Sequence, residues 1–415
     1  MWNNLTRSLR NPNYRRYFFG QLISLHGTQI AMVAQSWLVY SLTKSSLMLG
    51  LVSFTMLFPI LLFGLFGGVL ADRISRRRLM IGSQGVAMLL AFLLASLALS
   101  GQIEVWHIFL IVFFLGLAQA IDMPVRQSIL ADLVPRKELS NAVGLNSGAF
   151  NVARFAGPAV AGGLLLRWEE GVLFALNGVS YLVILFVLLT LRLPEKSSEG
   201  DRTGIKTIRG AGRMDALKEG LVHAWSHSEI RPALIHVGMV SMMGAAFVVL
   251  MPVFADQRFE GGPEMLGILL ASAGVGSVIG ALNLARRKES ESLTPIISRA
   301  GVLGAVALVI FAQSASLLAA MPVLTIVGFS VTTVIASSNA HIQVLIEDHL
   351  RGRIMSLFSV IFIGMAPIGS LCAGGLAEWM GIQLTVTLFA LFGGFGSILY
   401  AFKLFSPRDT EENSF

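Results

Sequence analysis

The fold is decided by the stretch Gly68-Val69-Leu70-Ala71-Asp72-Arg73-Ile74-Ser75-Arg76-Arg77-Arg78, an arginine-dense turn between two long apolar runs. A charged side chain at the centre of a bilayer costs about 2.5–3.5 kcal/mol on insertion scales. The arginines must therefore lie in water, and the cytoplasmic preference of basic residues places them on that side of the membrane. The stretch predicts a short cytoplasmic loop between two transmembrane helices.

The composition excludes a soluble globular protein. Of the 415 residues, 54% are hydrophobic and 13% are charged, whereas a soluble domain carries about 25% charged residues. The net charge of +7 does not indicate a nucleic-acid partner, because the basic residues lie in short loops between apolar spans. The single cysteine, Cys372, lies in an apolar span, and neither a cofactor nor a metal site is expected.

Stretches of predominantly apolar residues recur along the chain, each long enough to cross about 30 Å of hydrocarbon as an α-helix. We count twelve of them, so the sequence predicts an all-α membrane protein with twelve transmembrane helices. Their approximate bounds are 17–42, 46–70, 79–100, 105–131, 138–166, 171–191, 231–255, 264–285, 295–313, 316–346, 353–377 and 382–405.

The distribution of basic residues predicts the orientation. If both termini are cytoplasmic, nearly all lysines and arginines outside the spans lie on the cytoplasmic side, and only Lys44, Arg167 and Arg258 lie in loops opposite. Residues 1–16 are polar and basic, so the first span is expected to double as the insertion signal. The sequence therefore predicts a multi-pass protein of the cell (inner) membrane.

A charged segment divides the chain into an N-terminal six-helix bundle (1–191), a cytoplasmic linker (192–229) and a C-terminal six-helix bundle (230–415). Met214, Leu217, Leu221 and Trp225 recur at helical spacing in the linker and suggest an amphipathic helix on the membrane surface.

The two halves share small-residue patterns at corresponding places. Gly64-x-x-x-Gly68 precedes the arginine loop of the first half, and Gly276-x-x-x-Gly280 precedes Arg286-Arg287-Lys288 in the second. Such spacing lets helices approach closely. We expect two parallel repeats related by a pseudo-two-fold axis, with a substrate site between them at the midplane.

Charged residues inside the spans are the first functional candidates. Asp122 and Arg126 share one helix face and are expected to form an ion pair, which either responds to protons or only neutralises two charges. Arg154 lies midway along its span with Asn151 on the same face and no acid in that helix. It needs a partner from another helix, a watery cavity or an anionic ligand.

Polar residues in the spans are the second group. Gln21, Ser24, Thr28 and Gln35 form a stripe on the first span, which is expected to face the central cavity, although such stripes also join helices. His26 and His341 are candidate substrate or proton-coupling residues, and a lone histidine in a span can equally be a packing residue.

The arginine loop resembles the loop between helices 2 and 3 of major facilitator superfamily transporters, whose pattern is Gly-x-x-x-Asp-Arg/Lys-x-Gly-Arg/Lys-Arg/Lys. The matching residues are Gly68, Asp72, Arg73, Arg76 and Arg77, and Ser75 stands where the pattern has its second glycine. The resemblance implies a conformational latch, in which Asp72 meets the start of helix 11 near Arg351 and Arg353.

Further motifs spread over nearly the whole chain resemble the enterobactin-exporter branch of that superfamily. They include Asp122-x-Pro-x-Arg126-Gln127, Phe150-Asn151-x-x-Arg154, Asn339-x-x-x-Gln343 and Arg351-Gly352-Arg353-x-Met355-Ser356. The resemblance implies the major facilitator fold and secondary active export of siderophores, macrolides or other amphipathic compounds, usually coupled to proton entry.

No enzyme motif is present: the sequence holds no His-Glu-x-x-His, no Gly-x-Ser-x-Gly and no Walker phosphate loop. The leading interpretation is a monomeric, proton-coupled exporter of a small molecule. A flippase or importer of lipid-like substrates is the alternative within the same fold. A membrane receptor or assembly subunit ranks third, because it would need larger soluble loops than 192–229.

Overall fold

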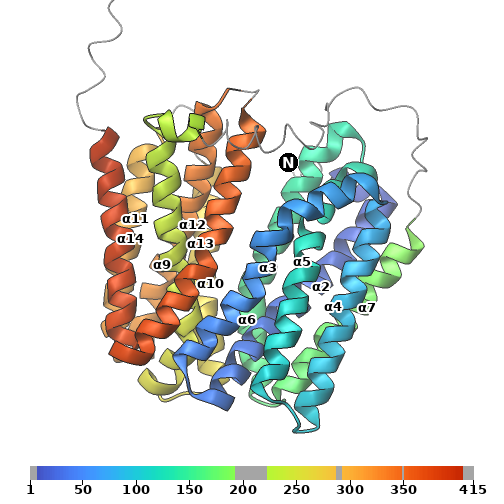
Figure 1. The fold of residues 1–415 in the computed structure, drawn as a ribbon, viewed down its shortest axis with the longest axis horizontal. Helices are drawn as coiled ribbons and strands as arrows, with labels where there is room; N and C mark the ends of the chain where they lie inside the picture. Colours follow the sequence, from blue (N-terminus) through green and yellow to red (C-terminus); the bar gives the residue numbers. More distant parts are fainter. Residues whose placement is uncertain (1–6, 192–221, 287–291, 348–349, 405–415) are drawn as a thin grey trace, which may run out of the picture. The chain divides into compact units, whose positions relative to one another are not determined.

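The computed structural model describes residues 7–191, 222–286, 292–347 and 350–404, without the side chains of 65–73, 155, 285, 352, 403 and 404. All regular secondary structure in these ranges is helical (Figure 1). The long helices are α2 (Pro12–Thr43), α3 (Ser46–Arg73), α4 (Arg76–Leu99), α5 (Val105–Leu133), α6 (Leu139–Leu165), α7 (Glu170–Thr190), α9 (Ile230–Val253), α10 (Pro263–Ala285), α11 (Thr294–Gln313), α12 (Leu317–Leu345), α13 (Arg351–Met380) and α14 (Ile382–Leu404).

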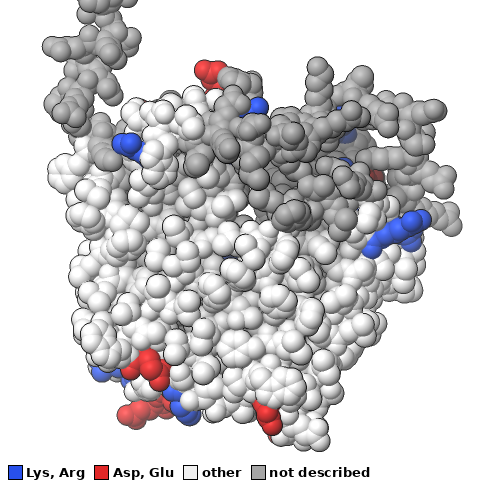
Figure 2. Space-filling model, viewed as in Figure 1, with Lys and Arg blue, Asp and Glu red and all other residues white. Residues whose placement is uncertain are grey.

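Among the described residues, 10 helices are long and apolar enough to cross a membrane. The prediction of an all-helical, multi-pass membrane protein is therefore confirmed. The long helices outside this set are α2 and α6, whose sequences include Gln21, Gln29, Asn151 and Arg154. On the face drawn in Figure 2, charged side chains lie near the helix ends and the band between them is uncharged, as a bilayer requires.

Local chemistry sets the helix ends. Asn11 accepts hydrogen bonds from the backbone N–H groups of Asn13 and Tyr14, and Pro12 opens α2 with its fixed φ angle. Ser75 accepts a bond from the Arg78 N–H and so caps α4 within the arginine loop. Gly101, with φ of 70°, turns the chain after α4.

The described residues belong to two compact units. The first comprises 1–195, 248–274 and 370–382, and the second comprises 196–247, 275–369 and 383–415. In the first, α3 packs on α5, α4 on α7, and α2 on both α6 and α7; in the second, α11 packs on α12. The predicted boundaries at 191 and 229 stay a prediction, and residues 192–221, which hold most of the predicted amphipathic helix, lie outside the described residues.

Close helix contact in the first unit depends on glycine at particular positions. A Cβ added at Gly116 of α5 would lie 2.2 Å from the carbonyl oxygen of Met56 in α3. Helix α6 uses the same device, since a Cβ at Gly157 would lie 2.4 Å from the Cβ of Gln29 in α2. These small residues bring the backbones together, which is how helices gain packing energy in lipid.

We expect Gly116→Ala to lower the thermal stability of the purified protein, since overpacking a tight contact costs about 1–3 kcal/mol. Gly85→Ala on α4 is the matched control, because its added Cβ meets nothing within 4 Å. The control is expected to keep or raise the melting temperature, given the better helix propensity of alanine. Equal melting temperatures for the two variants would contradict the packing interpretation.

Candidate functional site

The deepest ion pair of the first unit lies on α5, where Asp122 is 4% exposed. Its Oδ2 accepts a hydrogen bond from Nη2 of Arg126, one turn along the helix. Its Oδ1 accepts bonds from Nε2 of Gln84 at 2.9 Å and from Oγ of Ser83 at 3.2 Å, both on α4. The spacing of four predicts this pair, whereas the contacts from α4 are visible only in the structure.

Helix α2 brings polar side chains to the same region. The hydroxyl of Tyr17, fully buried, interacts electrostatically with Asp122 and Arg126. Three turns beyond it, Oγ1 of Thr28 donates to the carbonyl of Ser24 and lies 3.1 Å from the hydroxyl of Tyr181 on α7. Gly27 lies beside this contact. A Cβ added there would clash with the side chains of Ser180 and Asn177 of α7.

The polar stripe predicted on the first span is therefore packed between helices for much of its length. Gln21 is 1% exposed, and Thr28 contacts α7. Gln35 is half-buried. His26 donates from Nδ1 to the carbonyl of Leu22 at 2.8 Å, a bond within its own helix. The Thr28 contact joins two helices. The predicted roles of the four residues in binding or coupling stay predictions.

Arg154 stands on a different face of α6 from the residues that pack on α2. Ala149 and Ala153 are buried against α2, whereas Ser147, Asn151 and Arg154 are exposed. Asn151 donates to the carbonyl of Ser147 at 3.0 Å. No described residue forms a hydrogen bond or ion pair with the guanidinium of Arg154, which lies midway along α6. A charge within a membrane-spanning helix needs a ligand, water or a counter-ion.

The arginine loop is anchored to the first unit. Nη1 of Arg76 donates to the carboxylate of Asp132 and to the carbonyl of Ser128, each at 3.0 Å. Arg77 donates to the carbonyls of Leu188 and Leu189 at the end of α7, both at 2.7 Å. Cations suit a helix C-terminus, where backbone carbonyls lack partners.

The predicted latch contact between Asp72 and the start of α13 is not described by the structure. The side chains of Asp72 and Arg73, and the surroundings of Gly68, lie outside what the structure describes. Arg351 opens α13 and Arg353 follows in its first turn. The latch therefore stays a prediction.

In the second unit, His341 of α12 lies 3.8 Å from the carboxylate of Glu229, which directly precedes α9. A second histidine, absent from the candidates chosen above, is more deeply buried. His236 of α9 is 1% exposed, its Nε2 lies 2.8 Å from Oγ of Ser397, and its ring stacks on Tyr400. In the sequence, the only indication of His236 is that it lies inside an apolar run. The same weak signal made His26 a candidate.

Two carboxylates of the first unit lie at helix ends: Asp256 just after α9 and Glu378 near the end of α13. Asp256 accepts from the hydroxyl of Tyr40 at 2.9 Å and from Nζ of Lys44 at 3.1 Å. Glu378, near the end of α13, accepts from Oγ of Ser45 at 3.0 Å and from the backbone N–H of Ser46, also at 3.0 Å. It thereby caps the N-terminus of α3, where a negative charge is favourable.

We expect Glu378→Ala to destabilise the first unit by about 0.5–2 kcal/mol, the usual loss when a helix cap is removed. Glu378→Gln is the matched variant, since its amide oxygen still accepts from the N–H groups and should retain much of the stability. The measurement is thermal melting of the purified variants. A Gln variant as unstable as the Ala variant would show that charge, rather than capping, matters there.

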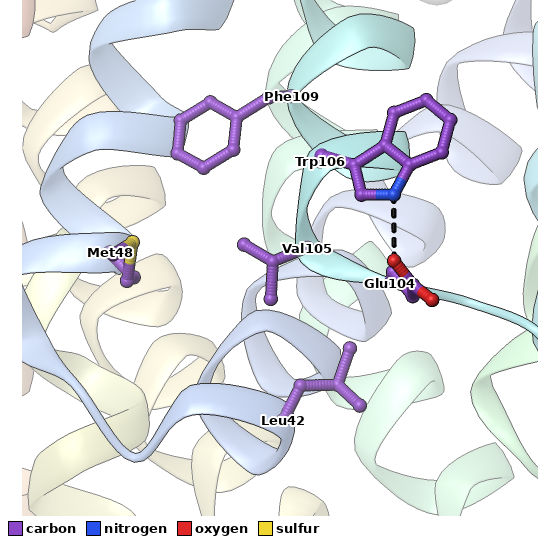
Figure 3. Close-up of a pocket in the computed structure, with 6 residues that line it drawn as sticks. All are labelled: Leu42, Met48, Glu104, Val105, Trp106 and Phe109. Carbon is purple, nitrogen blue, oxygen red and sulfur yellow. Dashed lines mark hydrogen bonds between the residues drawn. The ribbon is translucent and has the colours of Figure 1, made fainter.

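A pocket of about 570 Å³ opens at the first turn of α5 (Figure 3). Its lining is mainly apolar: Leu42, Met48, Val105, Trp106 and Phe109, with Glu104 at one side. Nε1 of Trp106 donates to Glu104 at 2.7 Å. The pocket lies at the opposite end of α5 from Asp122, and an exposed tryptophan at a helix end suits a membrane interface. It is not the candidate site.

Comparison with known proteins identifies relatives over nearly the whole chain. The family model described as "Transmembrane secretion effector" matches residues 6–413. The staphyloferrin A transporter of Staphylococcus aureus is 26% identical, with 91% of this chain and 92% of that protein covered. The multidrug efflux pump Tap of Mycolicibacterium fortuitum is 25% identical (93% and 94% covered), and macrolide efflux protein A of Streptococcus pyogenes is 23% identical (88% and 89%).

Among solved structures, a bacterial homolog of the human lysosomal transporter Spinster, in an inward-facing conformation, matches with a TM-score of 0.74 at 16% identity. The match covers 95% of this chain and 96% of that one. At this identity the likeness concerns the fold alone.

Proposed function

Because this chain belongs to the transmembrane secretion effector family of the major facilitator superfamily, we propose that it exports an amphipathic small molecule, such as a siderophore or a macrolide, in exchange for entering protons. Members of the superfamily are transporters, not enzymes. Relatives named for staphyloferrin A transport, multidrug efflux and macrolide efflux support this substrate class.

The proposal includes the membrane arrangement. Helices α2 and α6 cross the bilayer beside the ten apolar spans, which places both termini and the arginine loop in the cytoplasm of a monomer in the cell (inner) membrane. The anchoring of Arg76 and Arg77 to the ends of α5 and α7 supports a loop held at one membrane surface. Asp72, Arg73 and the arginines that begin α13 form the conformational latch in this proposal.

The observation that carries the proposal is the contrast between Asp122 and Arg154, two charged residues within the helices of the first unit. Asp122 is a buried carboxylate within a span, paired with Arg126 and held by two further donors, and we assign the proton-coupling role to it. Arg154 has no described partner, so it suits an anionic or strongly polar group of the substrate. A transporter that couples protons to a ligand needs both kinds of site.

The test is transport into inverted membrane vesicles. An acidic lumen should drive uptake of the exported compound, and a panel of staphyloferrin A, a macrolide, a catecholate siderophore and a lysolipid identifies it. Collapse of the pH gradient by a protonophore should abolish uptake. Uptake that survives the protonophore would contradict proton coupling. The direction of transport would then be tested by comparing uptake into inverted and right-side-out vesicles.

The alternative is a flippase or importer of lipid-like substrates, which the same fold allows. The exposed aromatic and aliphatic side chains of the helices are compatible with such a substrate, although contact with lipid explains them equally well. Preferential movement of the lysolipid in the vesicle panel would favour this function.

A further inference from the structure

Five buried polar atoms on α2, α4 and α5 have no hydrogen-bond partner among the described residues, and three of them belong to the ion pair of α5 or to residues that interact with it. They are the hydroxyl of Tyr17, Oε1 and Nε2 of Gln21, Oε1 of Gln84 and Nε of Arg126. Nearly all buried polar atoms in proteins are satisfied, by protein groups or by ordered water. A group of such atoms in one place therefore indicates that something binds there.

Three of the five atoms, on Tyr17, Gln84 and Arg126, lie at the ion pair. Nε2 of Gln84 donates to Asp122, which leaves its Oε1 as the free end of the same amide. Arg126 pairs with that carboxylate through Nη2, and the hydroxyl of Tyr17 interacts electrostatically with both charged groups. Gln21 lies one turn beyond Tyr17 on α2, between that tyrosine and Thr28, which contacts Tyr181 of α7.

The chemistry of the atoms selects the ligand. Two of them only donate (Nε2 of Gln21 and Nε of Arg126), two only accept (Oε1 of Gln21 and of Gln84), and the tyrosine hydroxyl does either. A metal cation would meet two donor groups, one of them on the guanidinium of Arg126, and the carboxylate of Asp122 is already paired. Water both donates and accepts, and a buried water needs two to four polar partners.

We propose that ordered water occupies this site, between Tyr17, Gln21, Gln84 and Arg126, and carries protons to and from Asp122. The step is a transfer from a hydronium ion to the Asp122 carboxylate, which forms an O–H bond and leaves water; the reverse step releases the proton. The role in transport rests on the proposed proton coupling, whereas the binding of water does not.

The groups that face Asp122 are consistent with this role. Helix α5 supplies the cation Arg126, α4 supplies the neutral Ser83 and Gln84, and α2 and α7 supply the hydroxyls of Tyr17 and Tyr181. No second described carboxylate competes for the proton at this place. Ordered water beside Tyr17 and Gln21 thus leads to a single proton acceptor, the carboxylate of Asp122.

Radiolytic hydroxyl-radical footprinting tests the site in the full-length protein. X-rays generate hydroxyl radicals from water, and these radicals label only side chains in contact with that water. Tyr17 should be labelled about tenfold faster than Tyr14, which lies nearer the start of the helix, is equally buried, and donates its hydroxyl to the carbonyl of Ala142. Trypsin cleavage after Arg15 and Arg16 places the two tyrosines in different peptides. Equal labelling of both tyrosines overturns the proposal.

Gln21→Leu removes two of the five atoms and should reduce labelling of Tyr17 several-fold and slow proton-driven uptake, while exchange of labelled substrate continues. Ser36→Ala on the same helix is the control, since its hydroxyl already donates to Val33. Unchanged labelling in Gln21→Leu overturns the site as defined. Labelled Tyr17 in a protein without proton-driven uptake supports the water site and refutes the proposed coupling, so the two failures are distinguishable.

Discussion

Replacement of Asp122 by asparagine is expected to abolish uptake driven by a pH gradient while exchange of labelled substrate persists. Asparagine keeps the shape of the side chain and can still accept from Gln84, but it neither binds nor releases a proton. The protein should then bind and reorient with its substrate without the driving force. The measurement is gradient-driven uptake and counterflow in the same preparation of inverted vesicles.

The control is Glu104→Gln, which removes a carboxylate at the start of the same helix, where it accepts a bond from Nε1 of Trp106 at 2.7 Å. It should retain gradient-driven uptake. Since Asp122→Asn leaves Arg126 buried without its counter-charge, the double variant Asp122→Asn, Arg126→Gln provides a neutral form. Gradient-driven uptake by both Asp122 variants would move the coupling site elsewhere, with His26 the next residue to test.

Replacement of Arg154 is expected to weaken substrate binding far more than folding. Loss of a charge-assisted contact costs about 1.5–3 kcal/mol, which corresponds to roughly ten- to hundredfold in affinity. Lysine should restore little, because a planar guanidinium binds two oxygen atoms with parallel hydrogen bonds and an ammonium group acts as a point charge. The measurement is titration of the compound found by the vesicle panel into purified wild type, Arg154→Lys and Arg154→Gln.

Arg167→Gln serves as the control, since that arginine lies exposed in the loop that follows the same helix. It should bind the compound as the wild type does. Thermal melting of each variant separates the two explanations of Arg154. Unchanged affinity together with a strongly lowered melting temperature would make Arg154 a structural residue, and the substrate-site proposal would be withdrawn.

The sequence alone determined the helical, membrane-spanning architecture and nearly all of the helix bounds. The predicted spans 105–131, 171–191 and 295–313 agree within two residues with α5, α7 and α11. This accuracy has a physical cause, since a span must match the thickness of the hydrocarbon and ends where charged or turn-forming residues begin. The largest difference is at α2, which begins at Pro12, before its apolar run, because Asn11 caps it there.

Contacts within one helix were also predictable. Asp122 and Arg126 pair because residues four apart share a helix face, a relation that is written in the spacing. The absence of an acid near Arg154 in its own helix could likewise be read directly from the chain.

Only the tertiary structure decided which polar atoms meet across helices. Gln84 reaches Asp122 from α4, Glu378 caps α3 from α13, and His236 meets Ser397 of α14. Helix periodicity indicates which face a side chain occupies but not which helix lies opposite, because that choice depends on close packing at small residues far apart in sequence. Periodicity therefore made the polar stripe of α2 visible in the sequence, whereas the burial of Gln21 and its unpaired amide were not visible there.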